Sequence, residues 1–97
     1  MLHLVETDER PETAYRVPWR IRRSGRLITA VNGSRDALSG VIATHFPTGR
    51  LLLPHAVRVG SGGHVAFTFP SWEKPASAIA LLCWRVHGDE YLYRVAL

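Results

Sequence analysis

The chain has 97 residues, 46% of them apolar and 21% charged, a composition typical of one small globular domain and not of a disordered chain. No apolar run approaches the roughly 18 to 20 residues of a membrane helix, and the N-terminus lacks the basic start of a signal peptide, so none is expected. Since the single cysteine, Cys83, excludes an internal disulfide, we expect a reducing compartment: the cytoplasm, or a virion if the chain is phage-encoded.

The net charge of +4 is unevenly distributed along the chain. Residues 1–14 hold four acidic side chains and one arginine, a net charge of −3, whereas residues 15–97 hold eleven basic and four acidic side chains, a net charge of +7. We therefore predict an acidic N-terminal arm at 1–14 and a β-sandwich domain at 15–97. Three roles stay open for the apolar start of the arm, MLHLV: a first strand of the domain, a frayed terminus, or a strand added to a neighbour's sheet. Reciprocal docking of the acidic arm on the arginine stripe of another copy (Arg16, Arg20 and Arg22) would neutralise both.

The first strand of the domain is expected at 15–23, in the sequence YRVPWRIRR. Apolar and basic side chains alternate along it, so one face carries Val17, Trp19 and Ile21 and the other carries Arg16, Arg20 and Arg22. Because Pro18 cannot donate a hydrogen bond to a neighbouring strand, the pattern predicts an edge strand or a bulged one.

Further strands follow at short intervals, each bounded by glycine or proline. They are expected at 26–32, 41–46, 51–59 and 64–69, and on either side of the turn HGDE at 87–90. Pro54 predicts a kink or two short strands within 51–59, and 32–40 is expected to be a loop. The one candidate for a turn of helix is 34–38. About seven strands at this spacing predict an all-β sandwich or barrel.

Period-two alternation also predicts the core. The rings of Trp19, Phe67 and Trp84 share strand faces with aliphatic neighbours, so we expect them between the two layers. Tyr91 and Tyr93 lie on one face of the last strand and are expected to close the core beside them.

Two segments, VNGSRDALSGVIATH and LLCWRVHGDEYLYRV, resemble small immunoglobulin-like or fibronectin-type sandwich modules, of the kind found in actinobacteria and their phages. The resemblance covers residues 15–97. It implies about seven antiparallel strands in an immunoglobulin-like β-sandwich, with a small barrel as second choice. The disulfide pair of antibody domains is absent, so the resemblance implies no ligand and no site.

Chemistry-bearing residues form no recognisable catalytic set. The five histidines are dispersed, without an HxH or HxxxH pair, at His3, His45, His55, His64 and His87. Cys83 lies in an apolar strand, where a thiol is expected to be inert. The glycine cluster at 60–63 joins two strands and is expected to be a turn rather than a phosphate cradle. We predict that the protein is not an enzyme and has no catalytic residues, no metal and no cofactor.

The sharpest polar feature is a cluster of arginines around the first strand. We expect partner contacts at this cluster and at one loop tryptophan: Arg16, Arg20, Arg22, Arg23, Arg26 and Trp72. Three interpretations stay open for the arginines. They could form a solvated face that blocks sheet-to-sheet aggregation, a docking surface for an acidic protein, or a surface for nucleic acid.

Together these features predict a non-enzymatic protein-interaction or assembly module, in its finer form a small structural subunit of a phage or virus-like particle. Its partner would be another protein or copies of itself, and not a membrane. The alternative is a small β-barrel nucleic-acid-binding protein that uses the arginine-rich strand face.

Overall fold

The computed structural model describes the backbone of residues 2–5 and all of residues 16–97. Its strands are β1 (Leu2–Val5), β2 (Trp19–Ser24), β3 (Leu27–Asn32), β4 (Leu38–Phe46), β5 (Val57–Val59), β6 (His64–Thr68), β7 (Ile79–Val86) and β8 (Asp89–Ala96). Within this part of the chain the helical structure is one 3₁₀ turn, η1 (Pro75–Ser77), so the turn of helix considered at 34–38 was misplaced.

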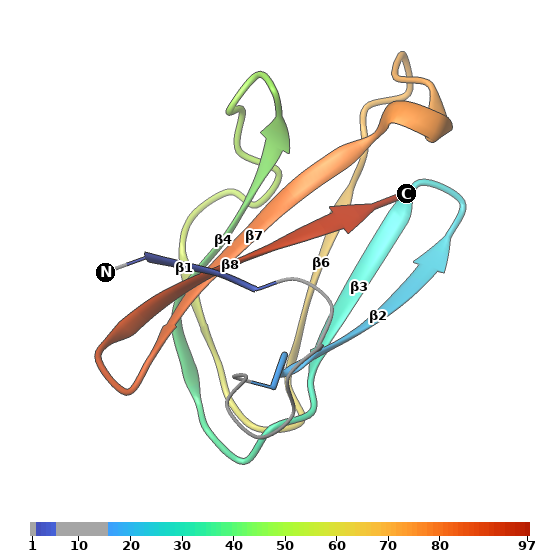
Figure 1. Cartoon of the computed structure of the whole chain (residues 1–97). Helices are drawn as coiled ribbons and strands as arrows, with labels where there is room; N and C mark the ends of the chain where they lie inside the picture. The colour runs from blue at the N-terminus through green and yellow to red at the C-terminus, as the bar shows by residue number, and fades with distance from the viewer. Residues whose placement is uncertain (1, 6–15) are drawn as a thin grey trace.

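The described strands form two sheets that face each other as two layers (Figure 1). One sheet has the order β2, β3, β6, and the other has the order β1, β8, β7, β4, β5. Neighbouring strands are antiparallel, except that β1 runs parallel to β8. The predicted all-β sandwich is therefore confirmed, and the second choice, a small barrel, is wrong because the two sheets do not close on each other.

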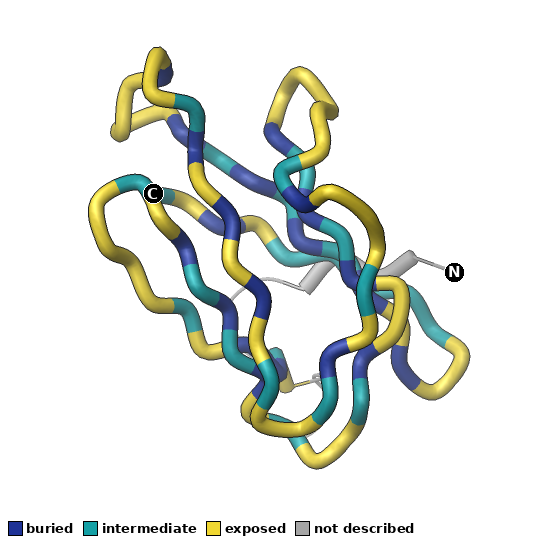
Figure 2. The backbone as a smooth tube through the Cα atoms, turned by 180° about the vertical axis from the view of Figure 1, so that it is seen from behind, coloured by how far each residue is buried: buried dark blue, intermediate teal, exposed yellow. Residues whose placement is uncertain are grey.

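The core lies where the alternation placed it. Trp19, Phe67 and Trp84 are 6%, 3% and 1% exposed. The Trp19 and Trp84 rings meet edge to face with their centroids 5.8 Å apart. The Tyr91 ring stacks on Trp84, also with a centroid distance of 5.8 Å. Along the strands, buried and exposed positions alternate, as Figure 2 shows from behind.

The last two strands form a hairpin in full register, from Ile79 opposite Ala96 to Val86 opposite Asp89. The residues at its tip, His87 and Gly88, have φ angles of 54° and 81°, as the favoured two-residue hairpin turn requires. Strand β8 also pairs with β1, so the chain's last strand is not the edge of its sheet.

Several strand boundaries differ from the expected ones. Strand β2 starts only at Trp19, after Pro18, and it lies at the edge of its sheet as predicted. Strand β4 begins at Leu38, inside the expected loop, because a bulge with Gly40 at φ 57° lets the strand pass through that glycine. The expected strand at 51–59 reduces to an isolated bridge at Leu51 and the short strand β5.

At the N-terminus, the backbone of Leu2–Val5 pairs with β8 over the register Leu2–Glu90 to Val5–Tyr93. Of the three roles considered for this segment, this is a strand of the domain. Residues 6–15, which carry the acidic side chains of the predicted arm and its boundary with the domain, lie outside the described residues, as does the docking suggested for that arm.

Candidate partner-binding site

One end of the sandwich gathers two long connections. The antiparallel strand directions bring together the loop 47–56, which follows β4, the loop 69–78, which follows β6, the β2–β3 turn and the end of β8 (Figure 1). We call this the Trp72 end. The β3–β4 loop, the β5–β6 turn and the start of β2 lie at the opposite end.

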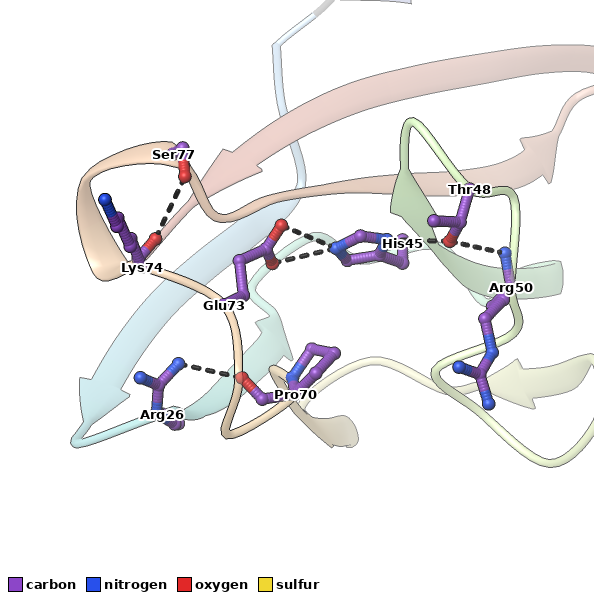
Figure 3. A network of polar contacts seen from close by, with 8 residues as sticks. All are labelled: Arg26, His45, Thr48, Arg50, Pro70, Glu73, Lys74 and Ser77. Atoms are coloured by element: carbon purple, nitrogen blue, oxygen red, sulfur yellow. Dashed lines mark hydrogen bonds and ion pairs between the residues drawn. The ribbon is translucent and has the colours of Figure 1, made fainter.

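A buried histidine–glutamate pair joins the two long loops (Figure 3). His45 continues the inward-facing positions of β4 and is 2% exposed, and Glu73 is 9% exposed. The Nε2 atom of His45 lies 2.8 and 2.7 Å from the two carboxylate oxygens of Glu73. Because a carboxylate only accepts hydrogen bonds, Nε2 carries a hydrogen and donates a hydrogen bond to this pair of oxygens.

The other ring nitrogen of His45 is held by its own loop. Its Nδ1 atom lies 2.7 Å from Oγ1 of Thr48, and that oxygen accepts a hydrogen bond from the backbone N–H of Arg50 at 3.3 Å. The Gly49 N–H donates to the carbonyl of His45, and the His45 N–H donates to the carbonyl of Arg50. Residues 45–50 therefore form a closed, hydrogen-bonded turn around the imidazole.

The loop that carries Glu73 is fixed independently. Arg26 Nη1 donates to the carbonyl of Pro70 at 2.8 Å, and the N–H of Phe69 donates to the carbonyl of Arg26 at 3.0 Å. Within the loop, the Glu73 N–H reaches the same Pro70 carbonyl at 3.2 Å. The loop is thereby attached both to the β2–β3 turn and, through Glu73, to β4.

This framework presents Trp72 to solvent. The residue lies between the anchored Pro70 and Glu73, and its side chain is 64% exposed. Its ring meets the His45 imidazole at an angle of 69°, with centroids 5.6 Å apart. Since its neighbours on both sides are hydrogen-bonded, little conformational entropy remains to be lost when a partner covers the ring.

Beside Trp72 lies a hollow of about 190 Å³ whose wall combines apolar groups with one cation; it is lined by His45, Arg50, Leu51, Leu52, Pro70 and Trp72. Leu51 is 55% exposed at its rim. Four large apolar side chains of the described part are conspicuously exposed, and all four belong to the Trp72 end: Leu27, Phe46, Leu51 and Trp72.

The Thr48–His45–Glu73 chain has the order of a hydroxyl, imidazole and carboxylate relay, as in hydrolases that activate a nucleophile. The surrounding N–H groups, however, are committed elsewhere: Gly49 bonds to the carbonyl of His45, and Arg50 bonds to the Thr48 hydroxyl. These two N–H groups are therefore not free to stabilise an oxyanion. The arrangement is suited to holding two loops together.

The predicted arginine cluster divides into two groups. Arg23 Nε donates to the carbonyl of Ala96 at 2.9 Å and so joins β2 to the end of β8. Arg26 bonds to the carbonyl of Pro70 and so joins the β2–β3 turn to the loop 69–78. Arg16, Arg20 and Arg22 are exposed, and their guanidinium groups make no hydrogen bond or ion pair within the described residues. Arg16 and Arg20 lie where β2 begins, at the end of the sandwich opposite Trp72.

Sequence reasoning missed His45 and Glu73. The burial of His45 could have been predicted, since Val41 and Ala43 precede it on the buried face of β4. Glu73 gave no such signal, because it lies in a loop 28 residues further along the chain.

No group of three or more histidine, cysteine, aspartate or glutamate side chains within residues 16–97 is placed to hold a metal ion. A helix of the length and apolar character needed to cross a bilayer is likewise not found in the described part of the chain.

Comparison with known proteins gives no relative. No protein-family model matches the chain, and no curated protein and no solved structure is significantly similar to it.

Proposed function

We propose that the chain is a non-enzymatic protein-interaction module that binds its partner through the Trp72 end. The observation that carries this proposal is the concentration there of the exposed apolar side chains Leu27, Phe46, Leu51 and Trp72. Exposure of several large apolar side chains at one end of a domain is typical of interaction sites, and tryptophan and arginine are among the side chains most enriched in binding hot spots.

The buried network adds a second argument. A histidine–carboxylate pair removed from water contributes little net stability compared with apolar packing, so its presence between two loops calls for a positional reason. Here the pair fixes the loop on either side of an exposed tryptophan. Rigid presentation of an aromatic anchor lowers the entropic cost of binding.

The finer form of the proposal is a small structural subunit of a larger assembly, such as a phage or virus-like particle. It draws on the immunoglobulin-like resemblance, which the strand order supports: seven antiparallel strands divide into three and four. One departure is that β5 pairs with β4, where the fourth strand of a seven-strand constant-type domain pairs with the fifth.

The alternative, binding of nucleic acid, has one feature in its favour: the exposed arginines Arg16, Arg20 and Arg22 have no partner among the described residues. Single-strand binders also present exposed rings between their basic groups. The tryptophan nearest these arginines, Trp19, is 6% exposed and therefore offers no stacking platform.

The test combines self-association with differential capture. Light scattering up to millimolar concentration reports binding between copies, and immobilised protein captures partners from a lysate of the source organism. Trp72→Ala should abolish the concentration-dependent mass or the captured partner, and Leu51→Ala should weaken it. His64→Ala, which removes an exposed ring at the opposite end of β6, is the matched control.

A monomeric mass throughout, together with capture that Trp72→Ala leaves unchanged, would overturn the proposal. Equal loss in Trp72→Ala and His64→Ala would also count against it, since the binding would then not depend on this end of the sandwich.

A further inference from the structure

A second hollow lies at the end of the sandwich opposite Trp72, where β2 begins. It has a volume of about 310 Å³ and is lined by Arg16, Val17, Pro18, Trp19, Arg20, Gly33 and Ser34. Two of the three exposed arginines therefore border one cavity, and the third, Arg22, follows two residues further along the same face of β2.

A fully buried asparagine fixes the far wall of this hollow. Asn32 is 0% exposed, and its Nδ2 atom donates to the carbonyls of Asp36, Val59 and Gly60 at 2.8, 3.2 and 3.1 Å. Its Oδ1 atom accepts hydrogen bonds from the N–H and the hydroxyl of Ser34 at 2.9 and 2.7 Å. The loop at the rim of the hollow is therefore held in one conformation.

Arg20 lies against this wall at a glycine. A Cβ atom at Gly33 would stand 2.9 Å from Nε of Arg20, closer than side-chain carbons approach such atoms. The φ angle of Gly33 is not in the left-handed region, so a side chain at this position would act by displacing the Arg20 guanidinium rather than by straining the turn. The N–H of Gly33 also donates to the carbonyl of Pro18 at 2.7 Å, which joins the loop to the start of β2.

None of the four described carboxylates lines this hollow. Glu73 bonds to His45, Glu90 pairs with Arg85, and Asp36 pairs with His87 at 3.1 Å. Asp89, the fourth, also has an interaction. Within residues 16–97, which carry eleven basic and four acidic side chains, Arg16 and Arg20 have no acidic partner.

We propose that Arg16, Arg20 and the Gly33–Ser34 loop form a carboxylate-binding site for an acidic, extended segment of a partner protein. One carboxylate occupies the hollow between Arg16 and Arg20, and the next on the same side of the segment meets Arg22. Side chains two apart on a strand lie about 7 Å from each other, so alternate acidic residues match the spacing of Arg20 and Arg22. Guanidinium groups bind carboxylates through paired, charge-assisted hydrogen bonds.

Nucleic acid is the competing occupant, because phosphates also bind arginine. The residues that line the hollow offer no exposed ring on which a base could stack, since Trp19, their one aromatic member, is 6% exposed. The features left to select the occupant are the positive charge of the arginines and the spacing of Arg20 and Arg22, and an acidic peptide strand matches both.

The test is fluorescence anisotropy at low salt with a labelled eight-residue peptide of alternating glutamate and serine. Peptides with glutamine or lysine in place of glutamate are the controls. A 12-base single strand, a 12-base-pair duplex and inorganic phosphate serve as competitors. We expect the glutamate peptide to bind and the two control peptides not to bind. In competition, millimolar inorganic phosphate should displace the glutamate peptide more effectively than either oligonucleotide at the same total concentration of phosphate groups.

Three variants locate the site. Arg20→Gln should weaken the peptide about tenfold, the loss expected for one charge-assisted contact. Gly33→Ala keeps every charge but forces Arg20 away from the loop, and it should weaken binding several-fold. Arg58→Gln removes an equal charge from an exposed position on β5 and should leave affinity within about twofold.

Any of the following four outcomes would overturn the proposal. Equal weakening by Arg20→Gln and Arg58→Gln would indicate general charge attraction, and an unchanged affinity in Gly33→Ala would separate binding from this hollow. Preferential binding of either oligonucleotide would assign the face to nucleic acid. Absence of binding by the glutamate peptide at millimolar concentration would reject the site. Circular dichroism of each variant shows that a loss is not a loss of folding.

Discussion

The Nε2 atom of His45 lies within 2.8 Å of both carboxylate oxygens of Glu73, and this contact connects β4 to the loop that follows β6. It is a polar contact between residues 2% and 9% exposed, and the other buried polar residue of the described part is Asn32. Its effect is to hold the loop on which Trp72 is exposed.

His45→Ala should lower the free energy of unfolding by about 3 kcal/mol, because it leaves the Glu73 carboxylate buried without its donor. Urea denaturation measures the loss. Glu90→Gln is the control: it breaks the ion pair with Arg85, whose members are 43% and 65% exposed, and should cost less than about 1 kcal/mol. Similar losses in both variants would mean that the buried pair has no special structural role.

The two core tryptophans should differ in their tolerance of phenylalanine. Trp19 is buried with its Nε1 atom lacking a hydrogen-bond partner, so Trp19→Phe removes an unsatisfied donor along with some packing. Trp84→Phe loses ring area against both Trp19 and Tyr91. We expect costs of about 1 kcal/mol for Trp19→Phe and about 2 to 3 kcal/mol for Trp84→Phe in chemical denaturation. The reverse order would contradict this account of the core.

Stability should fall in alkaline solution, partly because of Cys83. Burial and, secondarily, the charge of Glu90 raise the pKa of this thiol above its usual 9.0. A raised pKa in the folded state stabilises the protein below the unfolded pKa, and this stabilisation is lost as the pH rises through the folded pKa. Cys83→Ala should therefore show a shallower decline in unfolding free energy above pH 9 than the parent protein.

The pKa of Tyr91 is raised as well, by burial and then by Asp89, and it acts in the same direction at somewhat higher pH. The parent and Cys83→Ala are therefore compared over the same pH series, so that the tyrosine contributes equally to both. Parallel pH profiles would show that Cys83 keeps its unfolded pKa after folding.

Deletion of residues 95–97 should prevent stable folding. Val95 is 2% exposed, the carbonyl of Ala96 accepts from Arg23, and the N–H of Leu97 donates to Ala78 at 3.1 Å. Burial of one such aliphatic side chain contributes about 1.5 to 3 kcal/mol, and the two hydrogen bonds add to it. Val95→Ala should give a folded but weakened protein. A truncated chain with the thermal midpoint of the full chain would contradict the central place of β8.

Much of the core could be predicted from the sequence. Alternation in β2, β6 and β7 placed Trp19, Phe67 and Trp84 inside, because each strand has one face turned to the other sheet. The same rule applied to Arg23 places it on the inner side of β2 with Trp19, which explains why it bonds across to β8 instead of joining the outer arginines.

The candidate sites were harder to predict from the sequence. Trp72 was identified as a contact residue because it lies in a loop, but its neighbours there are Leu51 and His45 rather than the arginines. Those neighbours come from β4 and the loop that follows it, and no periodicity relates that segment to the loop of Trp72.

The sequence by itself determined the class of fold and the buried face of each strand, because period-two alternation is a local property that any pleated strand must satisfy. Tertiary structure alone decided the pairing of His45 with Glu73, the division of the arginines and the gathering of exposed apolar side chains at one end. Those features depend on which strand ends meet, and that is set by the order of strands in the two sheets.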